Sequence, residues 1–391
     1  MDGGTELKII AFYLPQYYEF EENNKWWGKG FTEWTNVKKA KPLYKGHYQP
    51  TVPLNKNFYT LENIETMRWQ VNLAKKYSIY GFCFYHYWFG NNRQLMEKPV
   101  DRYLKSKELD LPFCLSWANH NWTRTWTGGD KEILMDMQYG DGIEWKRHFE
   151  YLDSFFKDER YIKIDGKPLL IIYAPHDIPN LNEMLTFFNK MAIKSGHRGI
   201  TYAAQSSFGK KQENLPMIDY FIQYEPNCAR LDAEANFSIS NIFRIGKTSL
   251  SFALDIQKVR IRRKIKSISK NKVCRVNTYK YDAIWSYILK RKIKSNKLLA
   301  GAFVNSDVTP RRQDRAIIYR GASPKKFQVY MEKLLKKVKN EYSQSVVFLS
   351  AWNEWGEGMY LEPDEKNGYG YLEAIRNVIE HGDSLYGVEK E

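Results

Sequence analysis

The sequence predicts an α/β protein that forms a (β/α)₈ barrel of the TIM type, with long first and sixth βα loops. The chain has 391 residues, a length that such barrels reach when insertions enlarge their loops. Short apolar runs alternate with amphipathic helical patterns, which is typical of a parallel sheet. Most of the runs end in polar or aromatic residues, as expected where barrel strands converge on an active site. We therefore expect residues 1–391 to form one domain, with a basic insertion at about 230–296.

Eight apolar runs are the predicted strands, and the side chains at their ends are expected to line one mouth of the barrel. The runs are residues 7–14, 80–84, 112–117, 169–173, 200–204, 220–224, 298–304 and 346–350. The candidate substrate-binding residues at these ends are Tyr13, Gln16, His86, Tyr87, Trp88, Asn119, Asn121, Trp122, Gln205, Glu225, Asp307, Trp352, Asn353 and Trp355. Aromatic residues make up 16% of the chain, enough to fill a core and to leave flat faces for stacking on sugar rings.

Helical patterns with a period of 3.6 residues fill the gaps between these strands. After Thr60, a predicted N-cap, the apolar residues between positions 64 and 77 fall on one face. A second pattern begins at Ser323 and carries six lysines between positions 325 and 339 on its outer face. We interpret those lysines as an ordinary solvated helix surface.

The first βα loop, residues 19–59, is longer than an ordinary connection. It is rich in tryptophan, which argues against disorder. Within it, Trp27, Glu33 and Trp34 are candidate substrate-binding residues. We expect this loop to form a wall of the cleft.

The sixth βα loop carries most of the positive charge. The net charge is +15, and residues 258–297 contain fifteen Lys and Arg against one acid, Asp282. Between positions 256 and 269, isoleucines share one helical face, and around it lie Arg262, Arg263, Lys264 and Lys266. A basic amphipathic helix predicts peripheral contact with an anionic membrane surface; the alternatives are a solvated helix or a flexible charged loop. Nucleic acid is not an expected partner, because no aromatic reading surface is interleaved with the charges.

The chain is expected to be cytoplasmic, and peripheral at the inner membrane if the insertion binds there. Neither a leader peptide nor an apolar run of 18 residues is evident. The four cysteines lack the spacings of a zinc site or a disulfide framework. No GxGxxG after a strand, P-loop or HExxH motif is present, so we predict neither a cofactor nor a metal, and a conventional glycosyltransferase is disfavoured.

Glu354 and Glu357 are the candidate catalytic residues. They lie in residues 352–358, WNEWGEG, directly after the last predicted strand. Processing a glycosidic bond requires one carboxyl that donates a proton and a second that acts as base or nucleophile. Gly356 allows a turn that brings both acids to one centre, and Trp352 and Trp355 could keep one of them protonated by excluding water.

The remaining charged candidates have structural alternatives. Arg124 binds a phosphate or uronate, or else stacks on a neighbouring indole. Glu225 pairs with Arg311 or Arg312, either as a structural ion pair or beside a ligand, and Arg311 is itself a candidate substrate-binding residue. His86, and likewise His120, binds sugar hydroxyls or is a satisfied structural histidine. Asp307 is either a ligand contact or a loop cap.

Five segments resemble a known family. Residues 11–16, 26–34, 117–123, 309–312 and 352–358 are similar to WbsX-type proteins, which occur in bacterial O-antigen and capsule loci and are classed as glycoside hydrolase family 99-like. The resemblance implies a (β/α)₈ enzyme that acts on α-glycosidic bonds with retention. This chain departs from the family pattern at two positions: His120 stands where the family usually has Glu, and Val308 stands where it usually has Asn.

The resemblance also implies separate roles for the two acids. Glu357 would be the acid/base at the glycosidic oxygen, and Glu354 would deprotonate the sugar 2-hydroxyl, which then forms a 1,2-anhydro sugar. The substrate would be an oligosaccharide or a lipid-linked glycan of O-antigen or capsule metabolism. A retaining glycosyltransferase and a non-catalytic glycan-binding protein are the alternatives.

Overall fold

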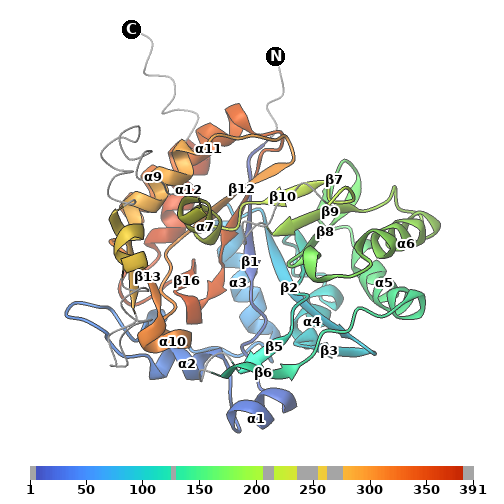
Figure 1. Cartoon of the computed structure of the whole chain (residues 1–391), viewed down its shortest axis with the longest axis horizontal. Coiled ribbons are helices and arrows are strands. Elements are labelled where there is room, and N and C mark those ends of the chain that lie inside the picture. The colour runs from blue at the N-terminus through green and yellow to red at the C-terminus, as the bar shows by residue number, and fades with distance from the viewer. Residues whose placement is uncertain (1–5, 125–128, 206–214, 236–253, 262–275, 382–391) are drawn as a thin grey trace.

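Eight parallel strands close into a barrel, as the sequence predicts (Figure 1). The computed structural model describes residues 6–124, 129–205, 215–235, 254–261 and 276–381. The barrel strands are β1 (Lys8–Tyr13), β2 (Gly81–Gly90), β4 (Phe113–Trp117), β8 (Lys167–Ile172), β9 (Thr201–Gln205), β10 (Tyr220–Ile222), β12 (Leu298–Phe303) and β14 (Val346–Ser350). Closure occurs at β1, where Lys8 pairs with Val346 of β14 and Ile10 pairs with Gly81 of β2. The strand ends therefore gather at one mouth.

The helices lie around the outside of the barrel (Figure 1). They are α3 (Ile64–Lys76), α4 (Glu97–Lys105), α5 (Gly142–Phe156), α6 (Leu181–Lys194), α7 (Asn227–Ala235), α9 (Tyr281–Lys290), α11 (Pro324–Glu341) and α12 (Gly370–His381). Ser323 caps α11 as expected, because its hydroxyl accepts from the backbone N–H of Lys326. Thr60 is not the cap of α3, which begins after Asn63; the Thr60 hydroxyl instead accepts from the backbone N–H of Glu62 at 3.2 Å.

Short helices and strands occur in the loops between the barrel elements. The first loop contains α1 (Glu21–Trp27), α2 (Glu33–Lys39) and η1 (Leu54–Lys56), and the other short helices are η3 (Pro175–Asp177), α10 (Thr309–Arg312), η6 (Gln313–Arg315) and η7 (Trp355–Glu357). The short strands are β3 (Arg93–Leu95), β5 (Trp122–Arg124), β6 (Gly129–Met135), β7 (Lys163–Ile164), β11 (Asn277–Lys280), β13 (Ile317–Arg320), β15 (Asn353–Glu354) and β16 (Met359–Tyr360). The first loop thus contains short helices, whereas its tryptophans had argued only against disorder.

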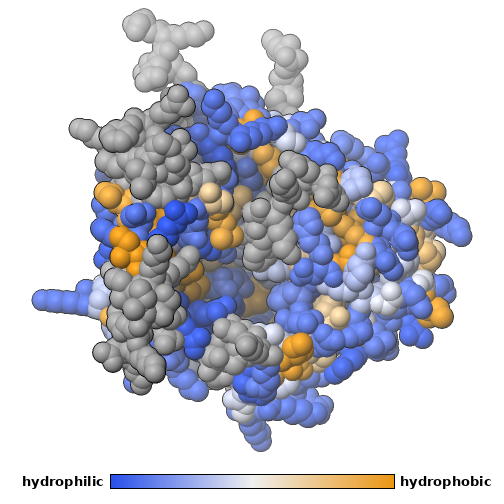
Figure 2. All heavy atoms as spheres, viewed as in Figure 1, coloured by the Kyte–Doolittle hydropathy of each residue, from blue (hydrophilic) through white to orange (hydrophobic). Residues whose placement is uncertain are grey.

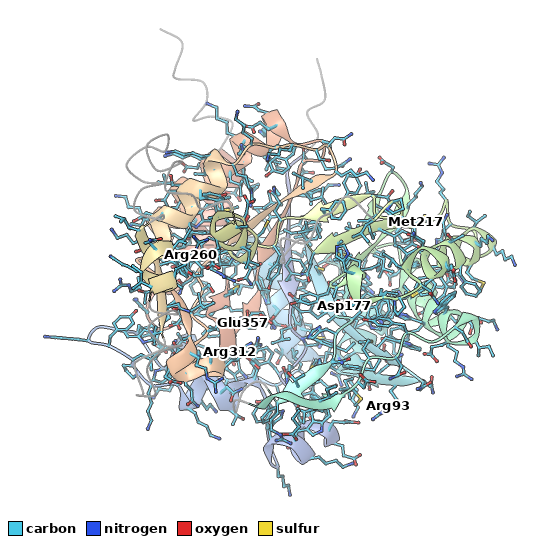
Figure 3. The ribbon with its side chains drawn as sticks, in the orientation of Figure 1. Arg93, Asp177, Met217, Arg260, Arg312 and Glu357 are labelled. Atoms are coloured by element: carbon cyan, nitrogen blue, oxygen red, sulfur yellow. The ribbon has the colours of Figure 1, made fainter. Side chains whose placement is uncertain are left out.

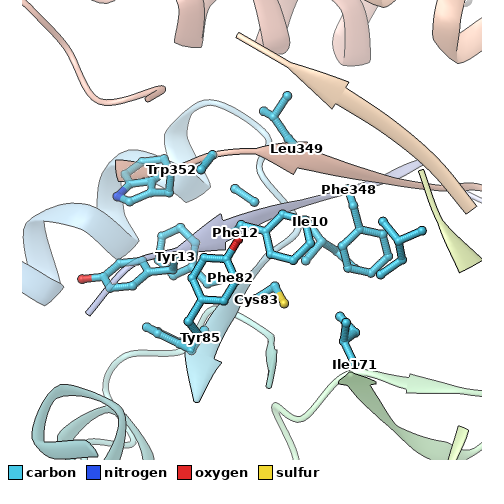
Figure 4. Close-up of a cluster of buried hydrophobic side chains, with 14 of the residues drawn as sticks. Ile10, Phe12, Tyr13, Phe82, Cys83, Tyr85, Ile171, Phe348, Leu349 and Trp352 are labelled. Carbon is cyan, nitrogen blue, oxygen red and sulfur yellow. The ribbon is translucent and has the colours of Figure 1, made fainter. Parts of the chain in front are cut away.

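Aromatic and aliphatic side chains fill the barrel (Figure 4). Phe12 of β1 stacks on Tyr85 of β2 with ring centres 5.6 Å apart, and it also contacts Phe348 of β14 at 5.7 Å. Trp352 is fully buried and packs on Phe82 at 5.0 Å. The core therefore extends up to the residues that begin the candidate motif.

The basic insertion is described only in part. β11 pairs in parallel with β13, so the C-terminal part of the insertion is integrated into the fold. Residues 254–261, which the structure describes, are helical, and Ile261 is 50% exposed. The predicted membrane-binding residues Arg262, Arg263, Lys264 and Lys266 lie outside the described residues. Among the helices that the structure describes, none combines the length and the apolar character needed to cross a bilayer.

Candidate active site

The motif at residues 352–358 is held in place by its own tryptophans. Trp355 is fully buried, stacks on Tyr360 with ring centres 3.7 Å apart, and donates from its indole nitrogen to Glu362 at 2.7 Å. Trp352 lies in the core. The two indoles therefore anchor the turn from within and do not line the cleft.

Arg311 connects both candidate acids to a third carboxylate. Its Nη1 atom donates to Oε1 of Glu357, and its Nη2 atom lies 3.5 Å from Oε1 of Glu354. Its Nε atom donates to Oε1 of Glu33 at 2.8 Å. Burial disfavours the charged guanidinium, yet the three carboxylates together raise the pKa of Arg311 well above its ordinary value. Arg311 is therefore a fixed cation at the centre of this cluster.

Gly356 permits the close approach of Glu33 to this cluster. A Cβ atom at position 356 would lie 1.7 Å from Oε1 of Glu33 and 2.9 Å from Nε of Arg311. The turn itself, η7, does not place Gly356 at a positive φ. The glycine is thus required for space, whereas the sequence suggested that it was required for the turn.

The two candidate acids have different environments. The side chain of Glu354 is 7% exposed and that of Glu357 is 25% exposed. Burial and the neighbouring Glu357 raise the pKa of Glu354 to about 8, although Arg311 opposes the shift. At neutral pH Glu354 therefore carries a proton.

A cleft of about 460 Å³ opens over these acids. The predicted residues that line it are Glu354, Glu357, Gln16, Trp27, Tyr87, Asn121, Trp122 and Arg311. Figure 2 shows that this face is hollowed near its centre, and Figure 3 places Glu357 and Arg312 together there. The amide nitrogen of Gln16 is buried and has no hydrogen-bond partner among the described residues, which suits contact with a ligand.

Three tyrosines of the cleft, Tyr85, Tyr173 and Tyr224, were not among the candidates. The Tyr85 hydroxyl donates to the Tyr224 hydroxyl at 3.3 Å. Tyr85 could have been found from strand alternation, because it lies two residues before Tyr87 and so points to the same side of β2. His120 also lines the cleft, and burial lowers its pKa.

His86 and Trp88 point to the opposite side of β2, away from the cleft. His86 Nε2 lies 2.9 Å from Nε2 of His148, and burial lowers the pKa of His86 to about 3. The Trp88 indole donates to Glu144 on α5 at 2.8 Å. Both residues therefore pack β2 against α5.

Several other candidates join the strand ends to one another. Asn119 donates to the carbonyl of Ala174 and accepts from its N–H, both at 2.8 Å. Asn353 makes the same pair of bonds to Leu14, at 2.7 and 3.0 Å. Because both amides use their two polar ends in this way, they hold the rim of the barrel and do not line the cleft.

Two more candidates support the motif from behind. The hydroxyl of Tyr13 donates to Gln70 at 2.6 Å, and Gln70 donates to Glu362 at 2.7 Å. The Trp34 indole donates to the carbonyl of Tyr59 at 2.8 Å. Glu362 also accepts from Trp355, so this network ends at the buried side of the turn that carries Glu357.

Asp307 fixes the loop beside Glu357. Its backbone N–H donates to the carbonyl of Glu357 at 2.7 Å, and its carboxylate accepts from His47 at 2.7 Å and Gln49 at 2.8 Å. Although burial raises it, these hydrogen bonds lower the pKa of Asp307. The backbone N–H of Thr309 donates to the same carboxylate at 3.0 Å, as in a loop cap.

Glu225 pairs with Arg291, at 2.6 Å, and not with Arg311 or Arg312 as the sequence suggested. The expected pairing is wrong because Arg311 is already engaged by the three carboxylates at the motif. Glu225 is fully buried and also accepts from the N–H of Ala229. It stabilises the start of α7.

Arg124 and Gln205 lie next to segments outside the described residues. Arg124 donates to Glu132 at 2.8 Å and to the carbonyl of Trp26 at 3.0 Å, and its guanidinium lies 5.4 Å from the ring centre of Trp27. Gln205, at the end of β9, is buried and does not line the cleft. Among the described residues, no group of three or more His, Cys, Asp and Glu is placed to hold a metal ion.

Comparison with known proteins identifies the relatives of this chain. The family described as Glycosyltransferase WbsX matches residues 9–375. The uncharacterized protein WxcX of Xanthomonas campestris pv. campestris strain B100 is 30% identical over 375 residues, which are 95% of this chain and 49% of WxcX. WxcX of strain ATCC 33913 matches equally well. The chain spans about half the length of these curated relatives.

Solved structures share the fold. The GH99 endo-α-mannosidase from Bacteroides thetaiotaomicron, in complex with bis-tris-propane, has a TM-score of 0.51 and 11% identity, and the match covers 97% of this chain and 98% of that one. A glycoside hydrolase-like protein has a TM-score of 0.56 and 13% identity, with 96% and 95% covered. At these identities the likeness is one of fold. Because the family match extends over almost the whole chain, the protein belongs to the WbsX glycosyltransferase family.

Proposed function

We propose that the protein is a carbohydrate-active enzyme of polysaccharide metabolism that acts on α-glycosidic bonds with retention. The observation that carries this proposal is the acid pair Glu354 and Glu357, held by Arg311 at an aromatic-lined cleft in the mouth of a (β/α)₈ barrel. The raised pKa of Glu354, about 8, keeps a proton on this acid at neutral pH, and two carboxyls in different environments are what glycosidic chemistry requires. Membership of the WbsX family supports the same class of substrate.

The proposed reaction has two steps. Glu354 removes the proton of the sugar 2-hydroxyl, whose oxygen attacks the anomeric carbon while Glu357 protonates the departing oxygen. The product of this step is a 1,2-anhydro sugar. Glu357 then removes a proton from water, whose oxygen opens the three-membered ring, and Glu354 returns its proton to the 2-oxygen. Two inversions at the anomeric carbon give net retention.

This mechanism requires the shared proton to move. The raised pKa of Glu354 keeps a proton on that residue. The reactive state needs it on Glu357, which is the more exposed acid and faces the cleft. Contact between the sugar 2-hydroxyl and Glu354 lowers the pKa of Glu354, because a hydrogen bond to a carboxylate favours its ionised form. The proton can then reside on Glu357.

The test is incubation with α-linked oligosaccharides of the protein's own polysaccharide locus, followed by mass analysis. We expect cleavage or rearrangement by the wild type and a loss of roughly a hundredfold or more in Glu357→Gln, with oligosaccharide binding retained. A substrate with an aryl leaving group should restore turnover to Glu357→Gln but not to Glu354→Gln, because only the first acid assists departure. Unchanged turnover by Glu357→Gln would refute its role.

A retaining glycosyltransferase is the second candidate, and the family description favours it. In that case a second sugar, in place of water, accepts the glycosyl group. Adding nucleotide sugars to the same incubation separates the two functions, because a transferase needs an activated donor and a hydrolase needs only glycan and water. Glycan binding without turnover under either condition would identify a non-catalytic binding protein.

The proposed setting is the cytoplasmic side of the inner membrane, with an oligosaccharide or lipid-linked glycan as substrate. The concentration of fifteen Lys and Arg within residues 258–297 supports this setting, because anionic lipid attracts such segments. Extraction of the protein with the membrane fraction at low salt and its release at high salt is the expected result.

A further inference from the structure

A second pocket, of about 250 Å³, lies behind the turn that carries Glu357. It is bordered by β13 and β16, on the same side of the molecule as α10 (Figure 1). Asp307 and Gly358 line it, and the backbone N–H of Asp307 donates to the carbonyl of Glu357 at 2.7 Å. One turn of chain therefore separates this pocket from the cleft. We name it the Tyr44 pocket, after the residue on its wall.

Two cations at the Tyr44 pocket lack anionic partners. The Arg320 guanidinium lies 5.8 Å from the ring centre of Tyr44, and Nζ of Lys366 lies 4.9 Å from that of Tyr48. Both cations are exposed, and in the described part of the chain neither forms an ion pair. The aromatic rings hold the two charges at the opening without neutralising them.

Two carboxylates also line the pocket, but protein donors already satisfy them. The N–H of Leu43 donates to Nδ1 of His47 at 3.0 Å, so Nε2 of the neutral ring donates to Asp307. Asp364 accepts from the Tyr360 hydroxyl at 2.8 Å. Because both carboxylates are buried and hydrogen-bonded while both cations are exposed, a ligand at the opening meets positive charge.

Two residues that line the pocket, Thr51 and Asn305, offer unused hydrogen-bonding groups. The hydroxyl oxygen of Thr51 and the amide oxygen of Asn305 are buried and have no partner among the described residues. Thr51 as a whole is 7% exposed. Buried polar atoms of this kind usually have a partner, so a hydroxyl-bearing ligand would complete the site.

We propose that the Tyr44 pocket binds one acidic sugar residue, a uronate whose carboxylate contacts Arg320 and Lys366 while its hydroxyls bond to Thr51 and Asn305. The volume is below the roughly 300–1,000 Å³ of sites for larger ligands, which suits a single sugar unit. Binding here needs neither Glu354 nor Glu357. The inference therefore stands apart from the proposed catalytic function.

Calorimetry with glucuronate and galacturonate tests the site, with glucose, galactose and inorganic phosphate as comparison ligands. We expect a uronate to bind at least about tenfold more tightly than its neutral counterpart, because the neutral sugar lacks the charge-assisted contact to each cation. We expect the same margin over phosphate, because phosphate cannot make the contacts of the sugar hydroxyls. The double variant Arg320→Gln/Lys366→Gln should lose about tenfold or more in uronate affinity. The matched double variant Lys190→Gln/Lys333→Gln removes two exposed charges, from α6 and α11, that form no ion pair within the described ranges, and it should bind like the wild type.

Further variants locate the ligand. Thr51→Val should weaken uronate binding, and Glu357→Gln should leave it unchanged. Absence of uronate binding by the wild type, or equal affinity in the Arg320→Gln/Lys366→Gln variant, would overturn the proposal. Tighter binding of phosphate than of uronate would show an anion site without sugar specificity. Loss of uronate binding in Glu357→Gln would place the uronate in the catalytic cleft. Either result would also reject the proposal.

Discussion

Arg311 allows three carboxyl groups to occupy one small region of the protein. Glu33 is fully buried and Glu354 nearly so, and burying such groups together costs free energy unless a cation compensates them. One guanidinium does not balance three negative charges. The protonation of Glu354, whose pKa is about 8, removes one of them. The same arrangement thus stabilises the fold and supplies a proton to the candidate active site.

The raised pKa of Glu354 predicts the high-pH side of the activity profile. We expect kcat/KM to fall as pH rises through about 8, because Glu354 then loses its proton. The sign follows from the direction of the shift: the protonated form of Glu354 is present below this pKa and is lost above it. Initial rates from pH 5 to pH 10 measure the profile.

Glu362 provides the matched control for this profile, because burial raises its pKa to about 7 but it lies behind the motif. Glu362→Gln should lower activity without moving the limb near pH 8. A limb that disappears in this variant would instead assign the titration to Glu362. The profile would then say nothing about Glu354.

Gly356→Ala should damage the site through a single methyl group. Its Cβ atom would lie 1.7 Å from Oε1 of Glu33, so Glu33 or the turn must move. We expect a loss of about 1–3 kcal/mol in the free energy of unfolding and at least about tenfold in kcat. Denaturant unfolding and initial rates measure the two effects. Gly142→Ala, where a Cβ atom meets nothing within 4 Å, should change neither, and equal behaviour of the two variants would contradict this account.

At the scale of elements, β2 shows that the face of a barrel strand that lines the cleft is not evident from its sequence. Tyr85 and Tyr87 line the cleft, whereas His86 and Trp88 pack outward against α5. Both faces of a barrel strand are buried, so its residues do not alternate between apolar and polar. The sequence therefore located all eight strands but could not tell which side of each strand faces the substrate.

The contacts of Arg311 could not be predicted for a different reason. Its partner Glu33 is 278 residues away in the sequence and belongs to the first loop. Nothing in the local pattern around either residue records that contact. By contrast, Glu354 and Glu357 are close in sequence and follow an apolar strand, so their common location was predictable. Local spacing reveals the acid pair, and only the closed barrel reveals the residues that hold it.

The packing of β2 against α5 predicts sensitivity to acid. Burial lowers the pKa of His86 to about 3 and that of His148 well below its ordinary value. As pH falls below about 6.5, the unfolded chain binds protons that the folded chain does not, so stability decreases by about 1.4 kcal/mol per pH unit for each histidine. The full contribution of the pair is present above that pH.

His86→Gln should reduce this slope between about pH 6 and pH 4, because one of the two buried histidines is removed. Denaturant unfolding at several pH values measures it. The control is His176→Gln, at an exposed position on η3, which should leave the slope unchanged. An identical slope in wild type and His86→Gln would show that His86 is not held neutral in the folded state.

At the scale of the whole molecule, the candidate acid pair and most of the net positive charge lie in different parts of the sequence. The acid pair lies at the end of β14, whereas residues 258–297 contribute a charge of +14 from fifteen cations and one acid. With a total of +15, the rest of the chain is close to neutral. An electrostatic attraction to an anionic surface would therefore act mainly through residues 258–297.

This separation predicts binding to anionic vesicles that does not depend on the active site. We expect the protein to co-sediment with vesicles containing anionic lipid at low salt and to be released as salt rises, because each Lys or Arg near the surface contributes about 1 kcal/mol. Neutralising Arg262, Arg263, Lys264 and Lys266 should abolish most of this binding and leave turnover of a soluble oligosaccharide unchanged. A matched variant that neutralises four lysines of α11, Lys325, Lys333, Lys336 and Lys339, removes the same charge from another surface and should still bind. An equal loss of vesicle binding in the two variants would mean that the net charge of the protein, and not the insertion, causes the attraction. Equal vesicle binding by the insertion variant and the wild type would reject the membrane contact altogether.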